Sequence, residues 1–156
     1  MYIPGIEGSD GITTLGLSMS RRLLAVCEKA DRAVCSIYDL TGISNMVPQP
    51  PKRKKVLTSH DCNSREFVSA CFSPHSEKTI LATLSSPYQL KDELGQVTGM
   101  AGDSKVILWV WEKAKCFSAA TLSYSDTVMP NQVSFSSLDA NVVVVTGCDF
   151  YRFFRV

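Results

Sequence analysis

The sequence predicts an all-β fold built from a repeated unit of four antiparallel strands. Two observations carry this prediction. The 156 residues divide into short β-rich apolar runs separated by polar turns, and the same order of runs returns twice. Each round opens with an alternating strand that ends in an apolar residue followed by serine, at Leu17-Ser18, Phe72-Ser73 and Phe135-Ser136. These anchors lie 55 and 63 residues apart.

The first unit has four predicted strands, at residues 12–17, 23–27, 33–38 and 55–58. The turns between the first three strands are short enough for hairpins, so neighbouring strands should be antiparallel. The fourth strand follows a Pro-rich connection, residues 42–51. Its prolines have no N–H to donate to a ladder, so this connection cannot lie inside a sheet.

The second unit has predicted strands at residues 67–74, 79–83, 106–111 and 116–122. An insertion, residues 85–103, separates the second strand from the third and contains three glycines. We expect this insertion to be a mobile loop. The third unit has predicted strands at residues 132–136, 141–146 and 151–156, and the chain stops during the last of them.

The spacing of the units predicts a β-propeller. Without the insertions 42–51 and 85–103, both anchor spacings come to the roughly 40 to 45 residues of a WD-type blade. The third strand of each full unit ends in an aromatic residue followed by an acid, Tyr38-Asp39 and Trp111-Glu112, a degenerate form of the Trp-Asp signature. A β-sandwich is the alternative, but it predicts no internal repeat. We therefore predict a WD40-type propeller segment of about two full four-stranded blades and partial flanking blades, with units at about 12–58, 67–122 and 131–156.

The composition excludes several classes of function. The chain has 16 Lys and Arg against 15 Asp and Glu, so no global field would attract nucleic acid or an anionic membrane. No apolar run approaches the roughly 20 residues of a membrane-spanning helix. The first residues lack the basic start and apolar stretch of a secretory signal, so we expect a location inside the cell. There the six cysteines should stay reduced and serve as small buried hydrophobes.

Several segments carry a family resemblance. They are residues 2–7, 11–15, 20–29, 52–57, 67–74, 109–113, 131–136 and 145–147. In this order they resemble the N-terminal propeller of the cilia- and flagella-associated protein 57 family of ciliary WD-repeat proteins. The resemblance implies a non-enzymatic scaffold in the axoneme, part of the cytoskeleton of the cilium or flagellum, with a role in placing or regulating inner dynein arms. It also implies a longer chain that supplies the remaining blades.

The densest charge cluster predicts where a partner binds. Lys52, Arg53, Lys54 and Lys55 place four positive charges where the chain enters an outer strand. Together with Arg21 and Arg22, they could meet an acidic surface on a dynein-arm-associated complex or a tubulin tail. The alternative is a solvated connection whose charges keep a sheet edge from pairing.

Two other groups have a chemical and a structural interpretation. His60 and Cys62 could belong to a thiol enzyme or a zinc site, but the chain has no Cys-x-x-Cys or His-x-x-x-His pair. We expect His60 and Asp61 to hold turns together instead. Trp109 and Trp111 lie two apart, hence on one face of a strand, and should pack against the next blade.

The sequence is compatible with three functions. The first is the axonemal scaffold, and the second is a generic cytoplasmic WD-repeat adaptor, which the same fold allows. The third is a thiol enzyme that uses Cys62 with His60 or His75. The sequence shows no Gly-rich phosphate loop and no paired-carboxylate constellation, so we expect neither a cofactor nor a catalytic site.

Overall fold

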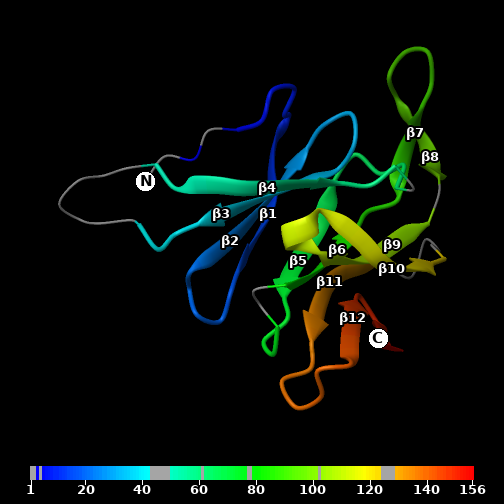
Figure 1. The fold of residues 1–156 in the computed structure, drawn as a ribbon. Helices are drawn as coiled ribbons and strands as arrows, with labels where there is room; N and C mark the ends of the chain where they lie inside the picture. Colours follow the sequence, from blue (N-terminus) through cyan, green and yellow to red (C-terminus); the bar gives the residue numbers. More distant parts are fainter. Residues whose placement is uncertain are drawn as a thin grey trace.

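The computed structural model describes residues 3, 5–42, 50–60, 62–76, 79–101, 103–123 and 129–156. These residues form three antiparallel sheets and a separate two-stranded hairpin (Figure 1). The predicted all-β fold is confirmed. Among the described residues, no helix is long and apolar enough to cross a membrane.

The first sheet has the order β1-β2-β3-β4. Its strands are β1 (Gly11–Leu17), β2 (Leu23–Lys29), β3 (Val34–Asp39) and β4 (Lys52–Thr58). Each lies where a strand was predicted, although β4 begins three residues earlier and so contains the whole basic run. Most of the Pro-rich connection before β4, residues 43–49, lies outside the described residues.

The second sheet has the order β10-β9-β6-β5. Its strands are β5 (Phe67–Phe72), β6 (Ile80–Ser85), β9 (Ser104–Val110) and β10 (Lys115–Leu122). A single 3-10 turn, η1 (Trp111–Lys113), follows β9 and ends at Ala114, whose φ of 49° is left-handed. The third predicted strand of this unit therefore ends one residue earlier than expected, at Val110.

The insertion between β6 and β9 is a β-hairpin, so the prediction of a loop was wrong. Strands β7 (Tyr88–Lys91) and β8 (Val97–Ala101) pair with each other in a sheet of their own. Asp92 closes the turn, because its Oδ1 accepts hydrogen bonds from the backbone N of Leu94 (2.9 Å) and of Gln96 (2.8 Å). Gly95 supplies the positive φ of 78° that this turn requires. Figure 1 shows the hairpin projecting from the body of the sheets.

The third sheet has three strands in the order β11-β12-β13. They are β11 (Pro130–Phe135), β12 (Val142–Gly147) and β13 (Phe150–Arg155). The first strands of the three sheets lie side by side, β1 against β5 and β5 against β11. Sheets stacked through their first strands have the arrangement of successive propeller blades around a central axis.

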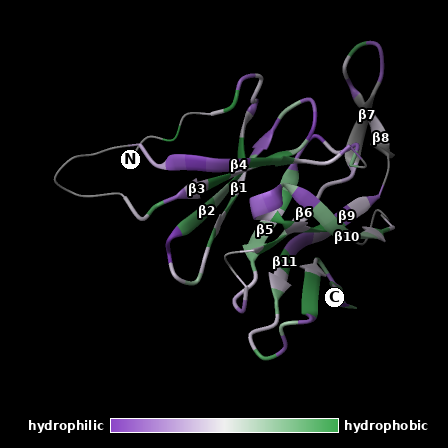
Figure 2. Ribbon diagram, viewed as in Figure 1, coloured by the Kyte–Doolittle hydropathy of each residue, from purple (hydrophilic) through white to green (hydrophobic). Residues whose placement is uncertain are grey.

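Two apolar clusters fill the spaces between the sheets, and Figure 2 shows the apolar strands that supply them. In the cluster between the first and second sheets, Trp109 lies edge-on to Phe67, and Trp111 lies edge-on to Phe72. The two tryptophans therefore share one side, as predicted. They pack against the preceding sheet, however, and not the next one, because the side of β9 that faces the third sheet carries Val106 and Leu108.

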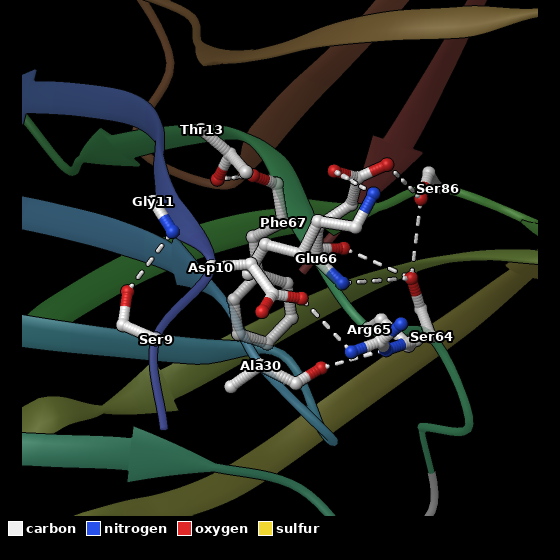
Figure 3. Close-up of polar contacts among 11 residues, drawn as sticks. Ser9, Asp10, Gly11, Thr13, Ala30, Ser64, Arg65, Glu66, Phe67 and Ser86 are labelled. Carbon is white, nitrogen blue, oxygen red and sulfur yellow. Dashed lines mark hydrogen bonds and ion pairs between the residues drawn. The ribbon is translucent and has the colours of Figure 1, made fainter. Parts of the chain in front are cut away.

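A polar clasp joins the first and second sheets at one end (Figure 3). Arg65, just before β5, donates from Nε to the carbonyl O of Ala30 in the β2–β3 turn (3.0 Å) and from Nη2 to Asp10 Oδ2 (2.9 Å). The backbone N of Ala30 donates back to the carbonyl O of Arg65 (3.1 Å). The hydroxyl of Thr13 in β1 donates to the carbonyl O of Phe67 (2.7 Å).

Candidate partner-binding site

The basic run lies on the outer strand of the first sheet. Lys52, Arg53, Lys54 and Lys55 are all exposed, and among the described strands β4 pairs with β3 alone, on one side. Charged side chains on such an edge oppose pairing with another strand. The same side chains are available to a partner.

The basic run faces η1 of the second sheet across a groove. One pocket of about 340 Å³ is lined by Lys52, Arg53, Lys54, Lys55, Trp111 and Glu112. A second, of about 210 Å³, is lined by Ser20, Arg22, Leu23, Asp39, Thr41, Lys54, Trp111 and Glu112. The two share three residues, so we treat them as one surface and call it the basic groove. It lies at the end of the sheets opposite the clasp, because β4 begins and β9 ends there.

Arg22 joins the basic run in this groove, and Arg21 does not line it. Both lie in the β1–β2 turn, which the Ser18 hydroxyl closes by accepting from the backbone N of Leu23 (3.0 Å). Arg21 is exposed and has a left-handed φ of 59°. This conformation costs a non-glycine residue roughly 1–2 kcal/mol.

One carboxylate inside the groove is already paired. Asp39 Oδ2 lies 2.9 Å from Lys54 Nζ, and Asp39 Oδ1 accepts from the hydroxyl (2.6 Å) and the backbone N (2.9 Å) of Thr41. The hydrogen bond from the Thr41 hydroxyl, followed by that from Lys54, holds the pKa of Asp39 well below its usual range. Lys54 is therefore engaged within the fold.

The other basic side chains of the run have no acidic partner in the described part of the chain. Among the described residues, no carboxylate lies within 4.0 Å of the charged groups of Lys52, Arg53 or Lys55. Three cations thus line one hollow surface together with the buried Trp111 and with Glu112. This arrangement suits an acidic peptide segment better than a small neutral ligand.

Sequence reasoning missed the acidic members of the groove. Asp39 and Glu112 were interpreted only as marks of the ends of third strands, although both line the groove. The sequence did contain a signal for these residues, since the third strand of one blade and the fourth strand of its neighbour recur at fixed positions in the repeated unit. Their approach in space depends on the packing of two sheets, which the order of residues alone does not reveal.

The remaining candidates have structural roles. His60 Nδ1 lies 3.2 Å from Arg32 Nη1, which also contacts the carbonyl O of His60, so this residue holds a turn. Asp61 lies outside the described residues. Cys62 is only 3% exposed and belongs to the apolar cluster between the first two sheets, whereas His75 is exposed. In the described part of the chain, no group of three His, Cys, Asp or Glu residues could hold a metal ion.

The six cysteines are free thiols, and they are not all buried. Cys27 and Cys35 face each other across β2 and β3 without exposure, and the hydrogen bond between the two thiols, together with burial, raises the pKa of Cys35. Burial also raises the pKa of Cys71. Cys148 is exposed, so the expectation of buried cysteines fails for this one.

Comparison with known proteins identifies relatives along nearly the whole chain. It is 30% identical over 155 residues to mouse "Cilia- and flagella-associated protein 57", a match that covers 99% of this chain and 11% of the relative. The chain is homologous to cilia- and flagella-associated protein 57. "Cilia- and flagella-associated protein 57 C" of Tetrahymena thermophila is 26% identical over 155 residues, which is 96% of this chain and 10% of that protein. This homology confirms the resemblance predicted from the sequence.

The matched relatives are much longer than this chain. The chain spans about a tenth of the length of the curated relatives. No family model matches it. A chain of the solved structure "Apo ctPRC2 in an autoinhibited state" has a TM-score of 0.57 and 11% sequence identity, over 92% of this chain and 28% of that chain. This second likeness concerns the fold alone.

Proposed function

We propose that this chain is a non-enzymatic, protein-binding segment of a ciliary or flagellar axoneme assembly, and that its basic groove binds an acidic segment of a partner. The observation that carries the proposal is that Lys52, Arg53 and Lys55 line one hollow of about 340 Å³ and that, among the described residues, none of the three pairs with a carboxylate. The homology to ciliary proteins supports the location. The burial of Cys62 speaks against a thiol enzyme.

The partner in this proposal belongs to the axoneme. A dynein-arm-associated complex with an acidic segment, or an acidic tubulin tail, has the charge that the groove requires. Through such a contact the chain would help to place or regulate inner dynein arms. In this proposal the groove contributes the position of the bound protein.

In the same proposal, further blades cover the two outward faces of this segment. Leu15 and Leu17 on β1 are 58% and 52% exposed, and Tyr151 and Phe153 on β13 are 73% and 63% exposed. Apolar groups in such number on two sheet faces favour burial against neighbouring sheets. The much greater length of the relatives is consistent with this arrangement.

A binding experiment tests the groove. The triple variant K52Q/R53Q/K55Q is compared with K115Q/R152Q/R155Q, which loses the same charge from exposed residues on β10 and β13. At about 0.5 kcal/mol for each exposed charge pair, the first variant should bind microtubules or isolated axonemes about tenfold more weakly. Its binding should also depend less on salt. Equal binding by the two variants would contradict the proposed site.

A further inference from the structure

The β7–β8 hairpin is built to present its tip. Its base is anchored to the clasp, since the Ser86 hydroxyl lies 3.2 Å from that of Ser64 and donates to Glu66 Oε1 (3.2 Å), as Figure 3 shows. Within the described residues, β7 and β8 pair only with each other. The ribbon therefore extends from a fixed base.

The tip of the hairpin has a defined conformation and an uncovered apolar side chain. Asp92 binds the backbone N of Leu94 and Gln96, and the backbone N of Gly95 donates to the carbonyl O of Asp92 (3.0 Å). These bonds hold Leu94 in a position where it is 84% exposed. The carboxylates of Asp92 and Glu93 precede it and are exposed as well. A fixed leucine beside two acids is suited to a hollow with a basic margin.

The basic groove is such a hollow, and it lies at the opposite end of the sheets. Strand β6 leads to the hairpin at the clasp end, and β9 leads back to η1 at the groove end. The base of the hairpin therefore lies at the end of the sheets opposite the groove of the same chain. A second copy could meet the hairpin in line.

We propose that the hairpin tip docks into the basic groove of a second copy of this chain. Glu93 would pair with the ammonium groups of Lys52 and Lys55, and Leu94 would enter the hollow beside Trp111. The contact joins two different surfaces, so repetition extends it into a head-to-tail row. This inference rests on the proposed function in one respect: it uses the same groove and names a particular acidic partner.

Zero-length crosslinking tests the contact directly. Chains with natural and with heavy nitrogen are mixed, treated with a carbodiimide that joins touching carboxylates and amines, and examined by mass spectrometry. We expect peptides of mixed isotope that join Glu93 to Lys52 or Lys55. The Asp39–Lys54 pair at 2.9 Å is an internal control that should crosslink within one chain. Abundant Asp39–Lys54 crosslinks without a mixed Glu93 crosslink would overturn the proposal.

Charge variants give a second, independent readout by sedimentation velocity. Self-association through the hairpin is electrostatic and should weaken between about 25 and 300 mM salt. E93K should abolish this salt-sensitive part of the self-association. E7K makes the same change at an exposed residue outside the hairpin and should leave it intact. Mixing E93K with K52E/K55E should restore association in low salt. The proposal is wrong if E93K associates like E7K, or if the mixture restores nothing.

Self-association through the apolar outward sheet faces would strengthen with salt. The same salt series therefore distinguishes it from docking of the hairpin. A polyglutamate peptide distinguishes failure of this inference from failure of the proposed function. Equal peptide binding by wild type and E93K, lost in K52Q/R53Q/K55Q, would support the groove whatever the outcome for the hairpin.

Discussion

Arg21 and Ala114 both hold a left-handed backbone conformation at the groove end of the sheets. Their φ values are 59° and 49°. A side chain in this region is unfavourable unless something compensates for it, and such strain often accompanies function. Ala114 ends η1 and has no side-chain chemistry to offer, whereas Arg21 exposes a charge beside the groove. The two residues therefore form a natural pair for comparison.

Replacement by glycine should separate strain from function. We expect Ala114→Gly and Arg21→Gly each to raise the free energy of unfolding by about 0.5–1 kcal/mol, because glycine tolerates positive φ. Only Arg21→Gly should weaken binding of an acidic peptide, by about twofold. Urea unfolding and a peptide titration measure the two effects. Unchanged peptide affinity in Arg21→Gly would mean that Arg21, which lies beside the groove, takes no part in binding.

Asp39 should give the fold a measurable dependence on acid. Its pKa is lowered in the folded chain by the hydrogen bond from the Thr41 hydroxyl and then by Lys54, whereas the pKa of an unfolded aspartate is about 3.9. The folded chain therefore binds fewer protons, and the stabilisation is present above about pH 4 and is lost as the pH falls below it. Stability should fall less steeply between about pH 4 and 2 in Asp39→Asn than in wild type. Asp103→Asn, which removes an exposed carboxylate outside the groove, should retain the wild-type slope.

At the scale of elements, the close approach of β1 to β5 depends on Gly16. A Cβ at this position would lie 2.6 Å from the carbonyl O of Ala70 in β5, too close for any real contact. Gly16→Ala should therefore force the first two sheets apart and cost about 1–3 kcal/mol of stability. Gly99→Ala in β8 is the control, since a Cβ there meets nothing within 4 Å. Thermal unfolding that shifts equally in both variants would argue against this packing constraint.

The elements differ in how far the sequence predicted them. Strands such as β2 and β9 were predictable because each contains five consecutive apolar residues and polar residues bound each run. The hairpin of β7 and β8 was missed because three glycines suggested a loop, although Asp92 and Gly95 mark a tight turn. The basic run was found as a charge cluster. Its neighbours Trp111 and Glu112 were not assigned to the same site, because η1 reaches β4 only through the packing of two sheets.

At the scale of the whole molecule, the first two sheets are joined differently at their two ends. The clasp end is closed by hydrogen bonds between backbone and side chains, chiefly those of Arg65. The groove end stays hollow, with pockets between β4 and η1. A rigid end opposite an open end lets a partner bind without separating the sheets. Loss of the clasp should therefore affect stability far more than binding.

Arg65→Ala tests this division. The lost bond to the carbonyl O of Ala30 should cost about 1–2 kcal/mol, while the exposed pair with Asp10 adds little. Arg32→Ala is the matched control, because Arg32 lies with Ala30 in the β2–β3 turn and, among the described residues, contacts His60, just after β4, and not the second sheet. Hydrogen exchange should accelerate at the amides of Ala30 and Ala33 in Arg65→Ala more than in Arg32→Ala, since both amides donate to the segment before β5. Affinity for an acidic peptide should stay within about twofold of wild type. A large loss of affinity would mean that the two ends are coupled and that the clasp sets the shape of the groove.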